Sequence, residues 1–160
     1  MKNSTGNSAA ILAVDVPARV KPSNYPAPFA TRMEGRVKRQ LGDAFQIQKF
    51  GVNLTELAPG AQSSLFHRHT KQEEFIYIIS GFPTLVLDRE EIKLAPGMCA
   101  GFTPEQGAHQ LVNRSEDLVT YLEIGDRVAG DEGSYPRDDL VAVLGSDGKW
   151  IWTHKDGRPY

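Results

Sequence analysis

Two histidines and a glutamate are spaced in the sequence as metal ligands would be. They are His67, His69 and Glu74. Because alternate side chains of a β-strand point to one face, a strand through residues 67–69 would present both imidazoles on the same side. The four residues between His69 and Glu74 allow the chain to turn and return as a neighbouring strand. Two imidazoles and a carboxylate that face one another form a divalent-metal site of mixed nitrogen and oxygen character.

A second segment carries another histidine, His109, in a short apolar run predicted as a strand over residues 108–113. The chain has four histidines, and His154 alone lies outside the two segments. Within the first segment, Glu73 competes with Glu74 as the carboxylate ligand. Strand alternation favours Glu74, because its face continues through apolar residues 76 and 78, which can fill an interior.

The two segments resemble the two sequence motifs of the cupin superfamily. The first motif, a glycine, a spaced His-x-His, a glutamate and a closing glycine, is matched by Gly60, His67, His69, Glu74 and Gly81. The second, a proline, a glycine, a histidine and an asparagine, is matched by Pro104, Gly107, His109 and Asn113. The chain is thus similar to small single-domain cupins, which are often likened to mannose-6-phosphate-isomerase-like proteins.

The resemblance implies one divalent metal ion, which would be Fe, Mn, Ni or Zn. Its implied ligands are His67, His69, Glu74 and His109. An unmetallated cluster in which the same side chains hydrogen-bond to one another is the alternative. The resemblance also implies an all-β fold, the cupin-type double-stranded β-helix or jelly-roll barrel.

The elements that must position these residues are short strands separated by turn signals, a pattern typical of an all-β sandwich or barrel. The expected strands cover residues 45–57, 63–69, 74–79, 84–87, 91–94, 98–102, 108–113 and 118–124. The tetrapeptide Leu-Ala-Pro-Gly occurs at residues 57–60 and again at 94–97. We interpret the two copies as matched corners of two barrel halves.

The sequence predicts three regions: an N-terminal arm (residues 1–42), the barrel (43–126) and a C-terminal extension (127–160) that packs on the barrel. In the arm we expect an edge strand over residues 10–14, a proline-rich extended stretch over 16–30, and a short helix over 34–41. The arm carries Tyr25 and Phe29, which it cannot bury alone. Docking on a second copy would cover them, which predicts a homodimer, and folding back on its own barrel is the alternative.

Length and charge exclude several classes of function. The chain has 160 residues, enough for one domain with a sizeable core, and a net charge of −2 with acidic and basic residues interspersed. This composition gives no electrostatic case for nucleic acid or an anionic membrane as partner. No stretch is apolar enough to span a membrane, and the N-terminus is a poor signal peptide, so we expect a cytoplasmic protein.

A metal held by four protein ligands keeps open positions for a small molecule. The favoured function is a metal-binding cupin that acts on a small polar metabolite (a sugar, sugar phosphate, keto acid or hydroxy acid) by isomerase, epimerase or lyase chemistry. An Fe(II)-dependent dioxygenase and a non-catalytic small-ligand-binding or sensory cupin are the alternatives. No catalytic acid or base can be assigned. Candidate polar wall residues are Gln46, Gln48, Asn53, Thr55, Glu56, Tyr121 and Glu123.

Overall fold

The computed structural model describes residues 9–21 and 23–160, and its regular structure is almost entirely β. The strands are β1 (Arg36–Gln40), β2 (Phe50–Leu57), β3 (Arg68–His69), β4 (Glu74–Ser80), β5 (Thr84–Leu87), β6 (Glu91–Lys93), β7 (Cys99–Phe102), β8 (His109–Val112), β9 (Val119–Asp126), β10 (Glu132–Ser134), β11 (Val141–Leu144) and β12 (Trp150–Thr153). The helical elements are α1 (Leu41–Ala44) and two 3-10 turns, Ala13–Asp15 and Phe29–Met33.

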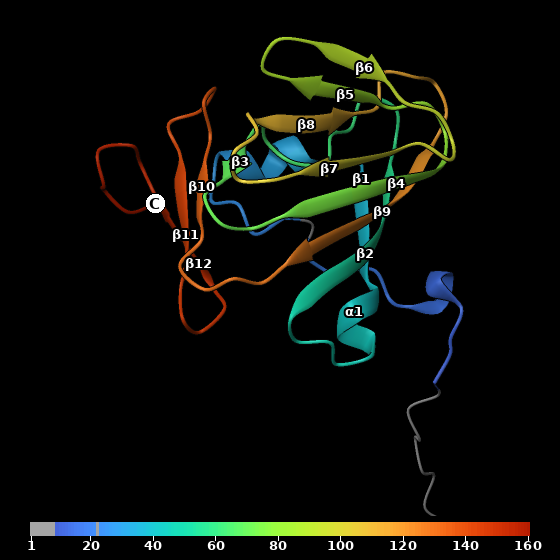
Figure 1. Ribbon diagram of the computed structural model, residues 1–160, viewed down its shortest axis with the longest axis horizontal. Helices are drawn as coiled ribbons and strands as arrows, with labels where there is room; N and C mark the ends of the chain where they lie inside the picture. Colours follow the sequence, from blue (N-terminus) through green and yellow to red (C-terminus); the bar gives the residue numbers. More distant parts are fainter. Residues whose placement is uncertain (1–8, 22) are drawn as a thin grey trace, which may run out of the picture.

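All strand pairs are antiparallel and form a jelly roll (Figure 1). One layer is a five-stranded sheet in the order β1-β2-β9-β4-β7. The facing layer contains a three-stranded sheet, β6-β5-β8, and a four-stranded sheet, β12-β11-β10-β3. Isolated bridges from residues 62 and 67 to β8 connect the two sheets of this layer. The predicted all-β jelly roll is confirmed, and most expected strands lie within one or two residues of the observed ones.

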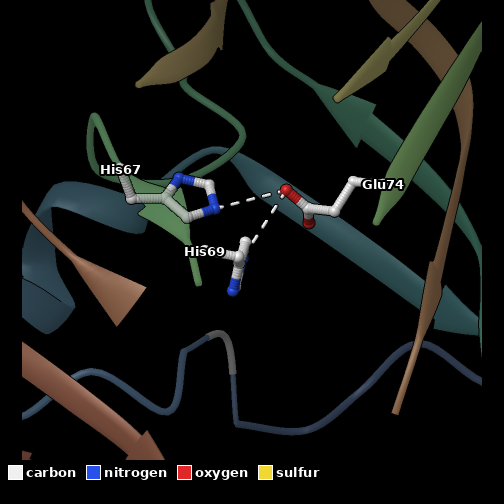
Figure 2. A group of neighbouring side chains, drawn as sticks. All are labelled: His67, His69 and Glu74. Carbon is white, nitrogen blue, oxygen red and sulfur yellow. Dashed lines mark ion pairs between the residues drawn. The ribbon is translucent and has the colours of Figure 1, made fainter. Parts of the chain in front are cut away.

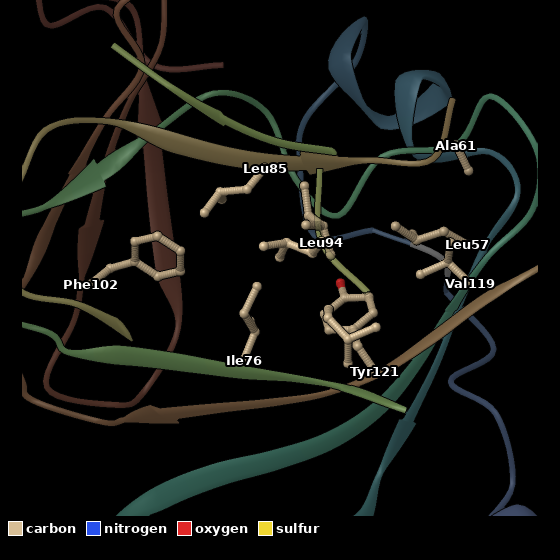
Figure 3. Packing of buried hydrophobic residues seen from close by; sticks show 10 residues of the cluster. Leu57, Ala61, Ile76, Leu85, Leu94, Phe102, Val119 and Tyr121 are labelled. Atoms are coloured by element: carbon tan, nitrogen blue, oxygen red, sulfur yellow. The ribbon is translucent and has the colours of Figure 1, made fainter. Parts of the chain in front are cut away.

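The main core fills the space between the two layers (Figure 3). On β4, Ile76 and Ile78 are buried, whereas Phe75 and Tyr77 are 40% and 42% exposed on the outer face. This alternation is the one expected of a strand with a single buried face. It places Glu74 on the inner face, at the end of the core, as the pattern predicted.

The two Leu-Ala-Pro-Gly copies form matching turns. Gly60 and Gly97 have φ angles of +80° and +88°, which favour glycine. In each turn the residue after the glycine donates its amide to the alanine carbonyl, at 3.0 Å in both cases. A proline followed by glycine at positive φ, closed by such a bond, is a type II turn. The interpretation of the two copies as equivalent corners agrees with this geometry.

Two predictions for the arm are wrong. Residues 36–40, expected in a helix over 34–41, form β1, because five successive residues pair with β2. The apolar spacing of Val37 and Leu41 resembled a helix face, but pairing with a neighbouring strand overrides that local preference; the helix α1 begins only at Leu41. Residues 10–14, expected as an edge strand, instead lead into a 3-10 turn. Contact with the sheet edge comes later, where Ala18 bridges Arg39.

The arm and the C-terminal extension share a second core. Its buried members are Phe29, Met33, Leu65, Tyr135, Leu140 and Ala142, and Tyr25, Trp150 and Trp152 pack against them. The ring of Tyr25 lies 5.1 Å from that of Trp152 and 5.8 Å from that of Tyr135. In this chain, therefore, the arm covers its own extension, which is the alternative to docking on a second copy, and the homodimer stays a prediction. Residues 1–8 and 22 of the predicted arm lie outside the described residues, and no helix in the described part could cross a membrane.

Candidate metal centre

The candidate ligands are brought together by strand pairing between distant segments. His67 and His109 exchange both backbone hydrogen bonds, at 3.2 Å and 2.8 Å. His69 ends β3, and Glu74 begins β4 after the intervening turn. The strand expected over residues 63–69 is interrupted. Residues 62 and 67 both bridge to β8, and they are five residues apart, whereas their partners on β8 are only three residues apart. Residues 63–66 form bends instead of continuing the strand, and the pairing with β8 resumes at His67.

Three imidazoles converge on one carboxylate oxygen. The Nε2 atoms of His67, His69 and His109 lie 3.4, 3.6 and 2.8 Å from Oε2 of Glu74. Figure 2 shows His67 and His69 approaching the carboxylate from one side. Ligand atoms of His67, His69 and Glu74 all lie within 4.8 Å of one another, so this group could hold a metal ion. Glu74, rather than Glu73, is the acidic side chain that faces the histidines.

Outer hydrogen bonds orient two of the imidazoles for ligation. Nδ1 of His67 lies 2.9 Å from the Leu65 carbonyl, and Nδ1 of His69 lies 2.6 Å from Oδ2 of Asp131. A carbonyl or carboxylate can only accept, so each Nδ1 donates and, in a neutral ring, the lone pair is on Nε2. Metal-bound histidines commonly have such partners. The donor set and its tautomers therefore fit a divalent metal ion.

Asp131 was not identified from the sequence. It is fully buried, and its Oδ1 accepts backbone amides from Thr70, Lys71 and Gln72 at 3.1, 2.7 and 3.1 Å. The residue thus fixes the turn that separates His69 from Glu74 as well as the His69 ring. Its position depends on the pairing of β10 with β3, a contact between segments about sixty residues apart, and no local motif indicates it.

His109 is oriented mainly by packing. Its ring stacks on Phe102 with centroids 3.7 Å apart and an interplanar angle of 4°. Its Nδ1 atom is buried and makes no hydrogen bond within the described part of the chain. Nε2 is consequently the only ring nitrogen of His109 that is engaged, and it points at Glu74.

The electrostatics of the cluster favour an ionised carboxylate. Burial would raise the pKa of Glu74, but hydrogen bonds from His109 and His67 and the nearby histidine charges outweigh it, so this pKa lies well below its usual value. Burial also lowers the pKa of His109. For His67 burial is outweighed by the Glu74 carboxylate and the Leu65 carbonyl, which raise its pKa. His67 therefore keeps its proton to a higher pH than an ordinary histidine does. That proton must leave before the imidazole can bind a metal.

A cavity of about 260 Å³ adjoins the three histidines and Glu74. Of the predicted wall residues, Tyr121 and Glu123 line it, and Gln48 and Asn53 line a neighbouring cavity that shares Glu123. Gln46, Thr55 and Glu56 line neither. The arm and the extension complete the wall with residues not assigned from the sequence, which include Arg19, Arg36, Lys38, Tyr135, Trp150 and Trp152.

Glu123 is held in place at both carboxylate oxygens. Its Oε1 is paired with Nζ of Lys38 and lies 3.3 Å from Nδ2 of Asn53, and its Oε2 lies 3.4 Å from the hydroxyl of Tyr121. Apart from Glu74, it is the only acidic residue that lines this cavity among the described residues. The site thus has two carboxylates in distinct environments, one among histidines and one beside a lysine.

Comparison with known proteins places this geometry in a family. The family model for the cupin domain matches residues 53–125. A crystal structure of a sugar phosphate isomerase of the cupin superfamily from Silicibacter pomeroyi is 36% identical with a TM-score of 0.87, over 94% of this chain and 96% of that one. A protein from Acidithiobacillus ferrooxidans, provisionally named a sugar phosphate isomerase, is 28% identical with a TM-score of 0.70, over 85% of this chain and 94% of that one.

A polyketide cyclase from Streptomyces resistomycificus shares the fold at 20% identity, with a TM-score of 0.61 over 74% of this chain and 79% of that one. None of the curated proteins compared with the chain matches it. The family model matches the barrel, and the likeness to the Silicibacter pomeroyi structure extends over nearly the whole of both chains. This chain therefore belongs to the cupin superfamily.

Proposed function

We propose that the chain is a metal-dependent isomerase of a small sugar or sugar phosphate. The observation that carries the proposal is the convergence of three imidazole Nε2 atoms on Glu74 beside a cavity that holds a second, separately anchored carboxylate, Glu123. The names of the two similar crystal structures support the choice of substrate.

His67, His69, Glu74 and His109 would hold one divalent ion, with Fe, Mn, Ni and Zn all compatible with this donor set. The ion would polarise a carbonyl oxygen of the substrate and so acidify the neighbouring C–H bond. Asp131 and the Leu65 carbonyl would keep the two imidazoles in the tautomer that binds metal. The aromatic wall formed by Tyr135, Trp150 and Trp152 would restrict water around the bound substrate.

Glu123 is the candidate for proton transfer. In an aldose, its carboxylate would take the proton from C2 and return a proton to C1, while the proton of the C2 hydroxyl moves to the C1 oxygen. The C1 carbonyl thereby becomes a hydroxyl and a carbonyl forms at C2, so atoms and charge balance. Its partners Lys38, Asn53 and Tyr121 hold the carboxylate in one orientation, as general-base catalysis requires.

A panel of aldose and ketose phosphates, incubated with the metal-loaded chain in D₂O and followed by NMR, tests the proposal. We expect interconversion of one pair with deuterium incorporated at the carbon that gains a proton. Glu123→Gln should abolish both while keeping the metal. Glu56→Gln is the matched control, because Glu56 alternates with the inward-facing Thr55 on β2 and does not line the cavity.

The two alternative functions give different outcomes in the same preparation. Oxygen consumption on loading with Fe(II) would identify a dioxygenase, and ligand binding without turnover across the panel would identify a binding protein. Either result would overturn the proposed isomerase. Turnover that survives unchanged in Glu123→Gln would remove Glu123 from the mechanism and leave the metal assignment intact.

A further inference from the structure

The outer face of the five-stranded sheet is apolar, although it faces solvent. On β4 its side chains are those of Phe75, Tyr77 and Ile79, which are 40%, 42% and 44% exposed. An antiparallel sheet with one solvated face normally carries apolar residues on the inner face and polar residues on the outer face. The strand β4 departs from that pattern, because both of its faces are apolar. The metal centre lies on the inner face and does not account for the outer one.

The register of the strands continues this apolar surface over the neighbours of β4, which lie side by side in Figure 1. Two rows of apolar side chains and one thiol cross β2, β9, β4 and β7 on the outer face. We call this surface the outer patch and define it by Val52, Leu54, Phe75, Tyr77, Ile79, Cys99, Leu122 and Ile124. In the next row Glu56 pairs with Thr120, so the margin is polar. An apolar centre with a polar rim is the usual composition of a protein–protein interface.

The size of the apolar surface matches the requirement of a dimer. At its margins Val37, Phe50 and Leu118 face the same side and are 38%, 42% and 51% exposed. At roughly 200 Å² for a large apolar side chain, these three and the exposed side chains of β4 present roughly 500 Å² to solvent. A standard interface buries about 800 Å² per partner, and about 65% of that area is apolar in homodimers. The two areas therefore agree.

The chemistry of the outer patch favours a second copy of this chain as the partner. Two copies related by a two-fold axis bring identical patches together. A charged patch would repel its own copy, whereas the members of the outer patch are apolar side chains and one thiol. Two sheets also pack well face to face, with about 10 Å between them and their side chains interdigitated. The outer patch is therefore suited to contact with itself.

The beginning of the described arm extends the apolar surface. Ile11, Leu12 and Val14 are 45%, 68% and 60% exposed, so this chain leaves them largely uncovered. They lie next to the outer face, because the Val16 carbonyl accepts a 2.9 Å hydrogen bond from Nη1 of Arg39, which pairs with Leu54 of the outer patch. One partner that is seated on the outer patch can cover both surfaces.

We propose that two copies of this chain associate face to face through the outer patch, about a two-fold axis. The interface uses the outer face of β4, and the metal centre uses its inner face. The assembly therefore does not depend on the proposed function, and either proposal can fail while the other stands. The inference assigns the dimer contact to the sheet, and not to an arm exchanged between copies.

The mass of the full-length chain and of two isoleucine variants, measured by light scattering after gel filtration, tests the interface. We expect a dimer for the parent. Ile79→Glu places a charge within the outer patch and should raise the dimer Kd roughly 30-fold or more, as loss of a central interface contact does. Ile151→Glu is the matched control, because Ile151 is 58% exposed on β12, outside the five-stranded sheet, and this variant should remain dimeric. Circular dichroism must show the parent β fold in both variants, and the uncharged Tyr77→Gln gives the same test if Ile79→Glu does not fold.

Cys99 reports on the same contact, because it is exposed and pairs with Tyr77 across β7 and β4. Its reaction with a thiol reagent should be slow at micromolar concentration of the parent and should accelerate on dilution, since dilution dissociates the dimer. In Ile79→Glu the reaction should be fast at every concentration. A monomeric parent, a folded Ile79→Glu or Tyr77→Gln with the parent Kd, a monomeric Ile151→Glu, or a rate at Cys99 that does not change on dilution of the parent would each overturn the interface.

Discussion

The carboxylate of Asp131 lies 2.6 Å from Nδ1 of His69, although the two residues are separated by sixty-two positions in the chain. The other oxygen of the same carboxylate accepts hydrogen bonds from three backbone amides in the turn between His69 and Glu74. One buried side chain from the C-terminal extension thus orients the candidate ligand His69 and also holds the turn that joins His69 to the next candidate ligand, Glu74. The extension is therefore part of the site.

Asp131→Asn is expected to lower metal affinity by about 10- to 100-fold, the usual effect of removing an outer partner of a ligating histidine. Asparagine keeps one oxygen that can accept the turn amides but loses the charge beside His69. Metal titration with a competing chelator measures the change. Asp138→Asn, which removes a carboxylate paired with Arg32, is the control and should leave the affinity unchanged. Equal affinities for the parent and Asp131→Asn would show that His69 needs no such partner.

Glu74→Gln and Glu73→Gln distinguish the two neighbouring carboxylates. We expect Glu74→Gln to weaken metal binding strongly and Glu73→Gln to have little effect, because Glu74 shares the inner face of β4 with Ile76 and Ile78. The same chelator competition gives both affinities. The reverse order would mean that the register of β4 is displaced by one residue, which would turn its buried face outward.

Metal affinity should fall as the pH is lowered, because imidazole binds metal only when neutral. In the metal-free chain the pKa of His67 is raised above its ordinary value of 6.5, with the Glu74 carboxylate and the Leu65 carbonyl outweighing burial. The protonated form therefore competes with the metal at higher pH than for an ordinary histidine, and the decline should begin above pH 6.5. Affinity measured in steps from pH 8.5 to 5.5 checks this. A flat profile across that range would exclude histidine ligation.

The homodimer expected from the sequence is tested by mass in solution. We predict that the full-length chain runs as a dimer at micromolar concentration, the commonest symmetric assembly. Light scattering after gel filtration gives the mass. The arm need not be exchanged to bury Tyr25 and Phe29, since both pack on the extension of the same chain. A monomeric mass for the full-length chain would contradict the prediction.

The ligand-bearing part of the fold could be predicted from the sequence because its signals are local. Strand alternation placed Glu74 beside Ile76, and the proline-glycine turns marked where strands end. The site residues that the sequence did not indicate depend on pairing between distant segments. Arg36 and Lys38 were expected in a helix, where they would not share one inward face, and pairing with β2 gives them that face. Asp131 was missed for the same reason, because only the β3–β10 contact brings it to His69.

Metal content tests the central claim most directly. Elemental analysis by mass spectrometry of the full-length chain and of His67→Ala/His109→Ala, both purified under the same conditions, gives the number of ions per chain. We predict about one divalent ion per chain for the parent and none for the double variant, with circular dichroism showing the same β fold in both, because four protein ligands define the site. A double variant that retains the metal content of the parent would show that the ion is bound elsewhere and would contradict the account.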